Sequence, residues 1–408
     1  MLHRATDLID QTGLKALAWL INPVSTTDFE QHFYERQLCL VPRAIPSYYR
    51  ELLSSRDLDN VLGTHDLRHP EISLARGEDT VPRSSYAHAS GRVDPLEVTK
   101  RFDEGATIIF NSLHRRVPSL ARLCVALGNI FGSRIQTNIY LTPPEAQGFK
   151  PHWDTHDVFV LQVHGHKVWS VYDSPISLPL KGQRFDPARD TPGPISEQFE
   201  LGPGSVVYVP RGLMHSARST NEISLHITLG LTAFTWIDLI LESAAAASLE
   251  NPSLRQNLPI GFASGRISAD EKTRLYREKL DLLQTQFNPA PVWRHFQDEV
   301  MATNTPLFTD LLGTRLQANP LTLDTVVNPR RDLVVKIESD GEKTVVRCRG
   351  QEISLPAHAL PAVKFATSTP TFKVRELPDC LTTEGKVTLV TRLVKEGLLL
   401  PQGSGTGE

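Results

Sequence analysis

The segment that most constrains this chain is residues 151–169, PHWDTHDVFVLQVHGHKVW. On an extended strand, His152 and Asp154 stand at positions i and i+2, so both side chains point to the same side. A third metal ligand can come from His215, which follows a Pro-Arg-Gly turn in the later run VYVPRGLMHSA. Two imidazoles and one carboxylate on one face of an octahedral iron leave three adjacent positions open, as in non-haem Fe(II) oxygenases. The pattern therefore predicts a metal site of His152, Asp154 and His215.

His156 competes with these ligands, because it lies two residues beyond Asp154 on the same face of the expected strand. An isolated His-x-Asp pair is weak support for a metal site, since such pairs occur by chance. Here the pair opens a strand-rich segment, and a turn with a histidine follows at the spacing that a barrel of strands needs. We therefore keep His152, Asp154 and His215 as the ligands and place His156 outside the set.

Lys167 lies in the otherwise apolar strand segment GHKVWSVY. A buried ammonium group is costly unless it is paired with an anion. A carboxylate cosubstrate that chelates iron at one end needs a cation for its other end, and Lys167 fits that role. A solvated lysine on an edge strand is the alternative interpretation.

Two further strand segments carry polar side chains that could complete a carboxylate site. Asn138 and Tyr140 alternate along TNIYL, and His226 and Thr228 alternate along SLHITLG, so each pair shares one strand face. These residues could equally be hydrogen-bonded polar groups of the core. The pattern alone leaves both interpretations open.

Composition excludes several classes of protein. The chain has 408 residues, of which 40% are hydrophobic and 22% charged, as expected for a globular protein of two or three domains. Its net charge of −3 and its interspersed charges predict no broad nucleic-acid-binding face. Four widely spaced cysteines without a CxxC pair argue against a cysteine zinc site or a disulfide framework. The N-terminus lacks the features of a signal peptide and no apolar run suits a membrane span, so we expect a cytoplasmic location.

Secondary-structure patterns change along the chain and predict an α+β protein. Residues 1–120 mix one short strand, from Leu38, with helical patterns that include a capped helix after Thr26. A further helix is expected from Val117, closed by Gly132. Short β-rich runs broken by proline and glycine fill residues 133–232, which favours an antiparallel sandwich or barrel.

The remainder of the chain is helical at first and mixed afterwards. Helical patterns return in two runs, one from Phe234 and, after a loop, one from Ile267. Residues 324–401 combine three strand-like runs with a helical run, which suits a small winged-helix-like module. Residues 402–408 give no basis for order.

On these motifs the sequence resembles the ribosomal oxygenases, a JmjC/cupin subgroup of Fe(II)- and 2-oxoglutarate-dependent protein hydroxylases. The resemblance runs from about Trp19 to Leu400. It is strongest where the ligand motif, Gly-x-Lys-x-Trp and Pro-Arg-Gly-x-x-His occur in this order. The family's iron ligands fall on His152, Asp154 and His215. Its 2-oxoglutarate contacts fall on one basic and three polar residues: Lys167, Tyr140, Thr228 and Asn138.

The resemblance also implies a domain layout and an activity. It implies a double-stranded β-helix (JmjC/cupin) domain over residues 1–232 with a barrel core at about 133–232, a helical dimerisation region at 233–323, and a winged helix at 324–401 that is not built to bind nucleic acid. The expected protein is a homodimer that uses Fe(II), 2-oxoglutarate and O₂ to hydroxylate a histidine or arginine side chain, most notably of a ribosomal protein. Lysine at position 167 matches the histidine-type members, whereas arginine-type members tend to carry arginine there.

Three alternatives remain open at this point. The chain could hydroxylate a peptide that is not ribosomal. It could be a cupin that uses manganese or zinc for non-oxidative chemistry, or a metal-binding regulator without oxygenase activity whose winged helix binds DNA. Metal analysis with a 2-oxoglutarate binding test distinguishes the non-oxidative cupin from an oxygenase. Salt-dependent DNA binding by the winged helix would favour the regulator.

Overall fold

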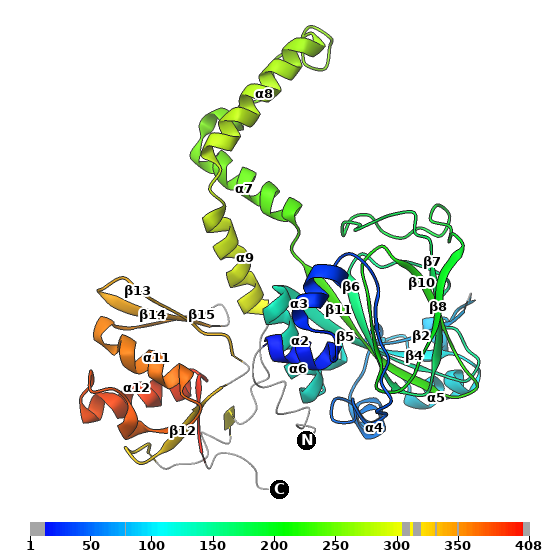
Figure 1. Cartoon of the computed structure of the whole chain (residues 1–408), viewed down its shortest axis with the longest axis horizontal. Helices are drawn as coiled ribbons and strands as arrows, with labels where there is room; N and C mark the ends of the chain where they lie inside the picture. The colour runs from blue at the N-terminus through cyan, green and yellow to red at the C-terminus, as the bar shows by residue number, and fades with distance from the viewer. Residues whose placement is uncertain are drawn as a thin grey trace.

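A computed structural model of the chain describes residues 13–77, 79–303, 311–312, 320–330, 333–348 and 351–402. Two antiparallel sheets form the body that holds the candidate site (Figure 1). The larger has the strand order β1-β9-β6-β11-β5-β4-β2-β3, and the smaller has the order β10-β7-β8. The antiparallel sandwich or barrel expected for the central residues is therefore confirmed.

The strands of the larger sheet come from both the central segment and the N-terminal third: β1 (Cys39–Val41), β2 (Ile72–Arg76), β3 (Asp79–Thr80), β4 (Thr107–Asn111), β5 (Ser133–Thr142), β6 (Asp157–His164), β9 (Val206–Val209) and β11 (Ser224–Ala233). The smaller sheet has three strands: β7 (Lys167–Tyr172), β8 (Ile195–Leu201) and β10 (Met214–Ser219). Only one strand was expected before residue 120, so the sheet extends beyond the predicted barrel core.

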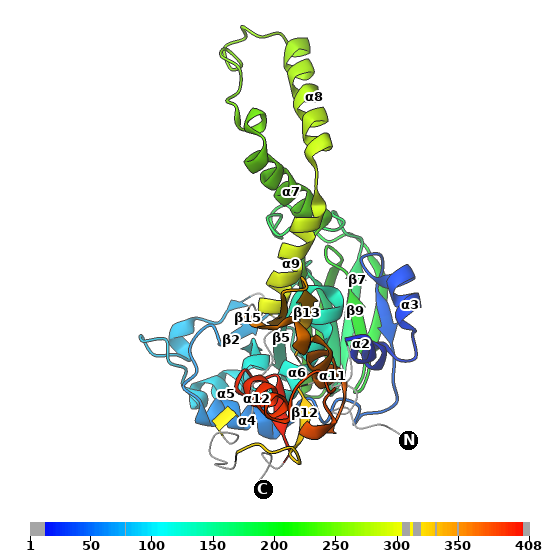
Figure 2. The ribbon, with the colours of Figure 1, turned by 90° about the vertical axis from the view of Figure 1, so that its left-hand side faces the viewer.

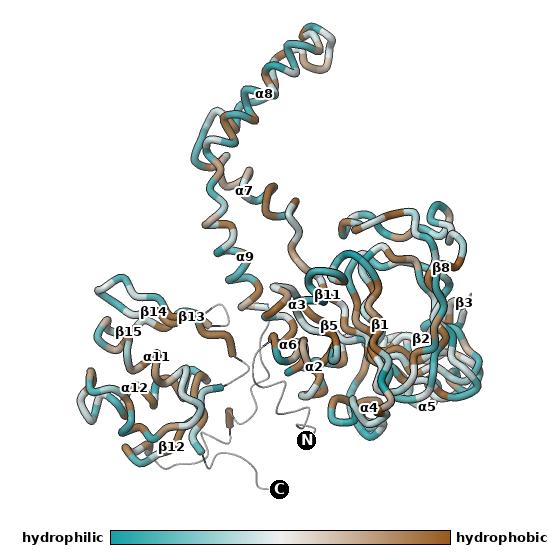
Figure 3. Tube along the Cα trace, in the orientation of Figure 1, coloured by the Kyte–Doolittle hydropathy of each residue, from teal (hydrophilic) through white to brown (hydrophobic). Residues whose placement is uncertain are grey.

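Helices α2 (Gly13–Ile21) and α6 (Pro118–Phe131) pack on each other and cover one side of the larger sheet (Figure 1). Figure 3 shows hydrophobic residues along these helices and along the strands beside them. Helix α6 has proline in its first turn and ends at Gly132, whose φ of 55° is left-handed. This is the end that the sequence predicted, because glycine adopts that backbone conformation without steric cost.

The helix predicted after Thr26 differs in two respects. Its cap is Ser25, whose hydroxyl accepts a hydrogen bond from the backbone N–H of Asp28 at 3.0 Å. The α-helical part, α3 (Thr26–Asp28), then passes into a π-helical turn at Phe29–Phe33. Two more helices occur before α6, α4 (Ser55–Thr64) and α5 (Pro95–Asp103).

Three helices form an arm that projects from the body (Figures 1 and 2). They are α7 (Trp236–Glu250), α8 (Ala269–Gln286) and α9 (Pro289–Thr303). The first two were predicted and α9 was not. Helix α7 begins with a capping box between Thr235 and Asp238. Among the described helices, none is long and apolar enough to span a membrane.

The C-terminal residues form a module with its own hydrophobic core. Its two three-stranded sheets have the orders β16-β12-β17 and β13-β14-β15. The elements are β12 (Val326–Pro329), β13 (Lys336–Ser339), β14 (Lys343–Cys348), β15 (Gln351–Pro356), α11 (Leu360–Ser368), β16 (Phe372–Lys373), α12 (Thr383–Lys395) and β17 (Leu399–Pro401). Of the tail predicted to lack order, residues 402–408, Gln402 donates its N–H to the carbonyl of Val326 at 2.8 Å, and residues 403–408 lie outside the described residues.

Candidate functional site

The three predicted metal ligands lie together at the junction of the two sheets. One ligand atom from each of His152, Asp154 and His215 lies within 4.8 Å of the other two. The closest carboxylate contact joins Oδ2 of Asp154 to Nε2 of His215 at 3.9 Å. Within the described part of the chain, this is the one cluster of three histidine, cysteine or acidic side chains that could hold a metal ion.

The backbone joins the two segments that carry these ligands. The N–H of His152 donates to the carbonyl of His215 at 3.0 Å, and the N–H of His215 donates to the carbonyl of His152 at 2.8 Å. The N–H of Gly212 also donates to the carbonyl of Asp154 at 2.9 Å. The expected continuous strand through His152 and Asp154 is not formed: an isolated bridge and a bend precede β6. His215 lies on β10, close after the Pro-Arg-Gly turn, so the expected ligand from a distant strand is found.

Hydrogen bonds fix which imidazole nitrogen is available for a metal. Nδ1 of His152 lies 2.8 Å from the carbonyl of Lys150, and Nδ1 of His215 lies 2.9 Å from the carbonyl of Leu213. Because a carbonyl only accepts, each Nδ1 carries the proton and each Nε2 keeps its lone pair. Burial and the neighbouring His152 lower the pKa of His215 to about 4, so its ring is neutral at pH 7. The donor set therefore fits a divalent transition metal.

Lys167 is buried in the interior of the barrel, with 4% of its surface exposed. Its strand, β7, is the central strand of the smaller sheet, so the alternative of a solvated edge-strand lysine is wrong. Its Nζ donates to the hydroxyl of Thr142 at 3.0 Å, and among the described residues no carboxylate pairs with it. Burial lowers the pKa of Lys167 to about 7. An ammonium group in this position calls for an anionic ligand.

A cavity of about 70 Å³ connects Lys167 with the metal ligands. Tyr140 and Thr228, both expected as cosubstrate contacts, line this cavity. Asn138 does not line it. Its Oδ1 accepts from the N–H of Ser112 at 3.2 Å, and its side chain hydrogen-bonds Tyr140, so it holds Tyr140 in place. The structure thus brings three of the four expected cosubstrate residues into one cavity.

Two residues that contact the site were not singled out from the sequence. Thr142, which accepts the hydrogen bond of Lys167, lies two residues after Tyr140 on the same strand face. Trp169 lies two residues after Lys167 and stacks on His215, with ring centroids 5.6 Å apart. Extending the two-residue alternation along both strands would have found these residues.

His226 is a further cavity residue, and it stacks on Tyr140 with ring centroids 4.8 Å apart. Burial, with a smaller effect from Lys167, holds the pKa of His226 well below 6.5, so its ring is neutral. Its buried Nδ1 has no hydrogen-bond partner within the described residues.

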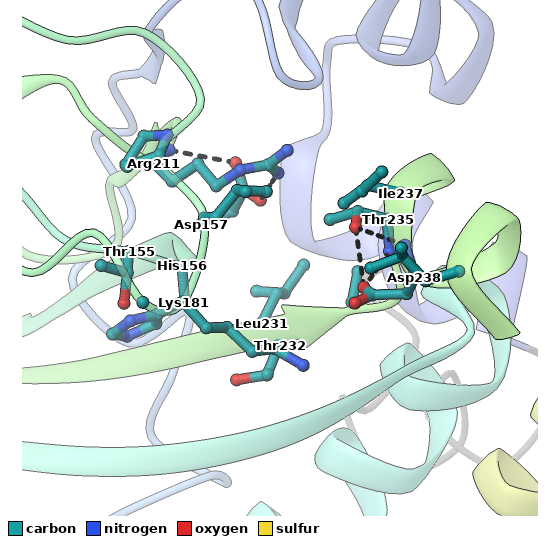
Figure 4. A pocket seen from close by; sticks show the side chains of 15 residues that line it. Thr155, His156, Asp157, Lys181, Arg211, Leu231, Thr232, Thr235, Ile237 and Asp238 are labelled. Atoms are coloured by element: carbon teal, nitrogen blue, oxygen red, sulfur yellow. Dashed lines mark hydrogen bonds and ion pairs between the residues drawn. The ribbon is translucent and has the colours of Figure 1, made fainter. Parts of the chain in front are cut away.

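A buried ion-pair network ties the two ligand-bearing segments together, and the sequence did not indicate it. Arg211 pairs with Asp157 at 3.2 Å and also with Glu35. The Tyr208 hydroxyl donates to Asp157 at 2.8 Å and accepts from the Glu35 N–H at 2.9 Å. Asp157 follows the ligand Asp154 by three residues. Arg211 lies in the Pro-Arg-Gly turn that precedes His215, so the network fixes the turn against the start of β6 (Figure 4).

Comparison with known sequences finds one matching family model and several similar proteins. The family model described as "JmjC domain" matches residues 112–239. A Drosophila willistoni protein named "Bifunctional lysine-specific demethylase and histidyl-hydroxylase NO66" is 30% identical over 71% of this chain and 39% of its own length. "Ribosomal oxygenase 1" of Rattus norvegicus is 29% identical over 94% of this chain and 71% of its own length. The chain thus spans about two fifths of the length of the Drosophila willistoni relative.

Comparison with solved structures supports the fold. The crystal structure of E. coli YcfD has a TM-score of 0.54 at 18% identity, covering 93% of this chain and 98% of that chain. YcfD in complex with cobalt and 2-oxoglutarate, where it is named a ribosomal oxygenase, has a TM-score of 0.51 at 16% identity, with 93% and 99% coverage. The chain therefore has a JmjC/cupin fold of mixed α and β content.

Proposed function

We propose that this chain, which belongs to the JmjC-domain family that includes the ribosomal oxygenases, is an Fe(II)- and 2-oxoglutarate-dependent protein hydroxylase. The proposal combines the family with the His152, Asp154 and His215 cluster. It also draws on the cobalt and 2-oxoglutarate that bind the related fold of YcfD.

The observation that carries the proposal is the buried ammonium group of Lys167 in the same cavity as the metal cluster. A dicarboxylate that chelates a metal at one end presents its second carboxylate to a cation at the other. Lys167 is that cation, and its charge is otherwise uncompensated by the described residues. Charge-assisted hydrogen bonds of this kind are stronger than neutral ones, because the donor is ionised.

Each residue has a defined part in the proposed reaction. His152, Asp154 and His215 would hold Fe(II), which supplies the O₂ chemistry that converts 2-oxoglutarate to succinate and CO₂ and places one oxygen atom on the substrate. Lys167 would bind the far carboxylate, with Thr142 orienting its Nζ. The apolar cavity walls, formed in part by Val158 and Val160, keep bulk water from the reacting atoms.

The proposed substrate is a histidine or arginine side chain of a ribosomal protein. The relatives' names, ribosomal oxygenase and histidyl-hydroxylase, support this class. The lysine at position 167 favours histidine on the family resemblance. We propose the iron cluster and the contacts from Lys167, Tyr140 and Thr228 as the functional residues, with Asn138 acting through Tyr140.

We also propose that residues 233–323 mediate a homodimer and that residues 324–401 form a winged helix. The arm leaves large apolar side chains in water, among them Trp236, 74% exposed, and Ile260, 91% exposed. A second copy of the chain would remove this surface from water. The C-terminal module combines helices α11 and α12 with small antiparallel sheets around one core, which suits a winged helix.

Binding of 2-oxoglutarate tests the proposal independently of the substrate. The titration is made calorimetrically without O₂, on protein loaded with Mn(II). Lys167→Met is expected to raise the Kd for 2-oxoglutarate by about tenfold to a hundredfold, because it removes a charge-assisted hydrogen bond. Lys181→Met, at an exposed lysine outside the cavity, serves as the control and should leave the Kd unchanged. Equal affinities of Lys167→Met and wild type would contradict the proposed cosubstrate site.

A further inference from the structure

A second cavity, of about 230 Å³, lies near the candidate metal centre, and Figure 4 shows the side chains that line it. Thr155, His156 and Asp157 line it, and these residues follow the ligand Asp154 in the chain. Its other walls come from the loop at 179–182, from Arg211, from the end of β11 and from the start of α7. It shares no lining residue with the metal cavity, so it is a separate compartment at the same end of the barrel.

The charged groups around this cavity are largely neutralised by the protein itself. Arg211 is paired with Asp157 and Glu35. Asp238 accepts hydrogen bonds from the N–H and the hydroxyl of Thr235, both at 2.7 Å, as Figure 4 shows. Lys181 is exposed to water. Because these groups are internally paired or hydrated, the cavity offers little to a charged ligand.

Apolar side chains form much of the remaining wall and keep surface in contact with water. Leu180, Ile237 and Leu241 are 44%, 39% and 62% exposed. Pro179 and Leu231 complete this wall. A ligand that covers these groups gains from removing apolar surface from water. The cavity chemistry therefore selects an apolar group.

A polar edge lies on the side of the metal centre. Thr155, His156 and Thr232 line the cavity, and within the described residues their side chains make no hydrogen bond. Hydroxyl and imidazole groups offer hydrogen-bond donors and acceptors, so they suit the N–H and C=O groups of a peptide backbone. The edge thus provides places for backbone groups beside the apolar wall.

We infer that this cavity binds a bulky apolar side chain of the protein substrate, about two residues from the residue that is hydroxylated. The inference rests on the proposed function and adds a specificity site to it. The cavity volume of about 230 Å³ leaves room for one large side chain. The cavity wall at Thr155 and His156 follows Asp154 directly in the chain, and an extended peptide advances about 3.3 Å per residue, so a side chain two residues from the hydroxylated one can reach it.

The test measures binding of short fluorescein-labelled peptides to the full chain with Mn(II) and 2-oxoglutarate. All peptides have a central histidine in an alanine background, and leucine or aspartate stands two positions from the histidine on either side. Wild type is expected to bind a leucine peptide about tenfold or more tightly than the matching aspartate peptide, since one buried apolar side chain contributes that much.

Two variants of α7 locate this preference. Leu241→Asp, at a rim residue of the cavity, is expected to abolish the preference for leucine. Ile240→Asp, at the neighbouring residue outside the cavity, should retain it; this residue is 47% exposed, so both changes spare the core. Size-exclusion chromatography with light scattering records whether either variant alters the number of copies in the particle.

Three results would overturn the inference. Equal Kd values for leucine and aspartate peptides, including no binding of either, would exclude an apolar subsite. Retention of the preference in Leu241→Asp would place the subsite elsewhere. Equal loss in both variants together with a smaller particle would assign this surface to a second copy of the chain. Succinate production from 2-oxoglutarate by wild type is measured alongside, and its absence would instead count against the proposed function.

Discussion

Replacing Arg211 with methionine is the sharpest test of how the fold holds the metal site. Only 11% of the Arg211 side chain is exposed, and 2% of that of its partner Asp157. Removing one partner of a buried ion pair typically costs about 3–5 kcal/mol, because the other charge stays buried without compensation. Asp157 keeps its hydrogen bond from Tyr208 at 2.8 Å, so we expect about 3 kcal/mol.

A matched control exists on α8. Arg274 also pairs with two carboxylates, Glu271 and Glu278, but 55% of its side chain is exposed. Because water screens exposed ion pairs, Arg274→Met should cost less than about 1 kcal/mol. The assay is urea unfolding followed by tryptophan fluorescence, with each variant compared with wild type.

Metal affinity gives a second readout that a general loss of stability does not produce. Arg211 and Asp157 fix the segments that carry His215 and Asp154, so Arg211→Met should weaken Co(II) binding to the folded protein by about tenfold or more. Arg274→Met should leave Co(II) binding unchanged. A stability loss no larger than that of Arg274→Met, with unaltered Co(II) affinity, would refute the positioning role of the network.

Three further predictions concern the cosubstrate site and one turn. Burial lowers the pKa of Lys167 to about 7, so 2-oxoglutarate affinity measured calorimetrically should be constant below that pH and fall about tenfold per pH unit above it. The unfolded chain keeps the Lys167 proton up to about pH 10.4, whereas the folded protein loses it near pH 7, so the unfolding stability of the free protein should rise with pH between these values. Lys167→Met should remove both this rise and the pH dependence of 2-oxoglutarate affinity. Thr142→Val should raise the Kd for 2-oxoglutarate by about tenfold, because the Lys167 ammonium loses its acceptor; an unchanged Kd would contradict this. Gly165→Ala should lower the free energy of unfolding by more than about 1 kcal/mol, because φ is 63° and the new Cβ would lie 2.0 Å from the Ile223 carbonyl oxygen. The control Gly63→Ala, in α4 with open space around the new Cβ, should be neutral or stabilising.

The sequence revealed the metal cluster because its chemistry is local. His152 and Asp154 are two residues apart, and the Pro-Arg-Gly turn marks His215. The lysine of the cavity was visible for a similar reason, since a charge within an apolar strand is costly. The strand expected through His152 and Asp154 was wrong, because an isolated backbone bridge to a distant segment leaves no periodic pattern in the sequence.

Other parts of the site depend on contacts between residues far apart in the chain. Glu35 and Arg211 are separated by 176 positions, and nothing in either local segment indicates that they pair. Strands β2 and β4 were missed because they read as short apolar runs among helices, and pairing with β5 decides their structure. The side chain of Asn138 was expected to reach the cosubstrate, but its hydrogen bonds direct it to Ser112 and Tyr140.

Intact-protein mass spectrometry tests the central claim most directly. Separated ribosomal proteins would be incubated with the chain, Fe(II), 2-oxoglutarate and O₂, and in parallel with Asp154→Ala, which lacks the carboxylate of the metal cluster. The account predicts that one protein gains the mass of a single oxygen atom with wild type and not with the variant or without 2-oxoglutarate. Wild-type protein that binds Fe(II) yet forms neither an oxidised protein nor succinate would contradict the assignment as an oxygenase.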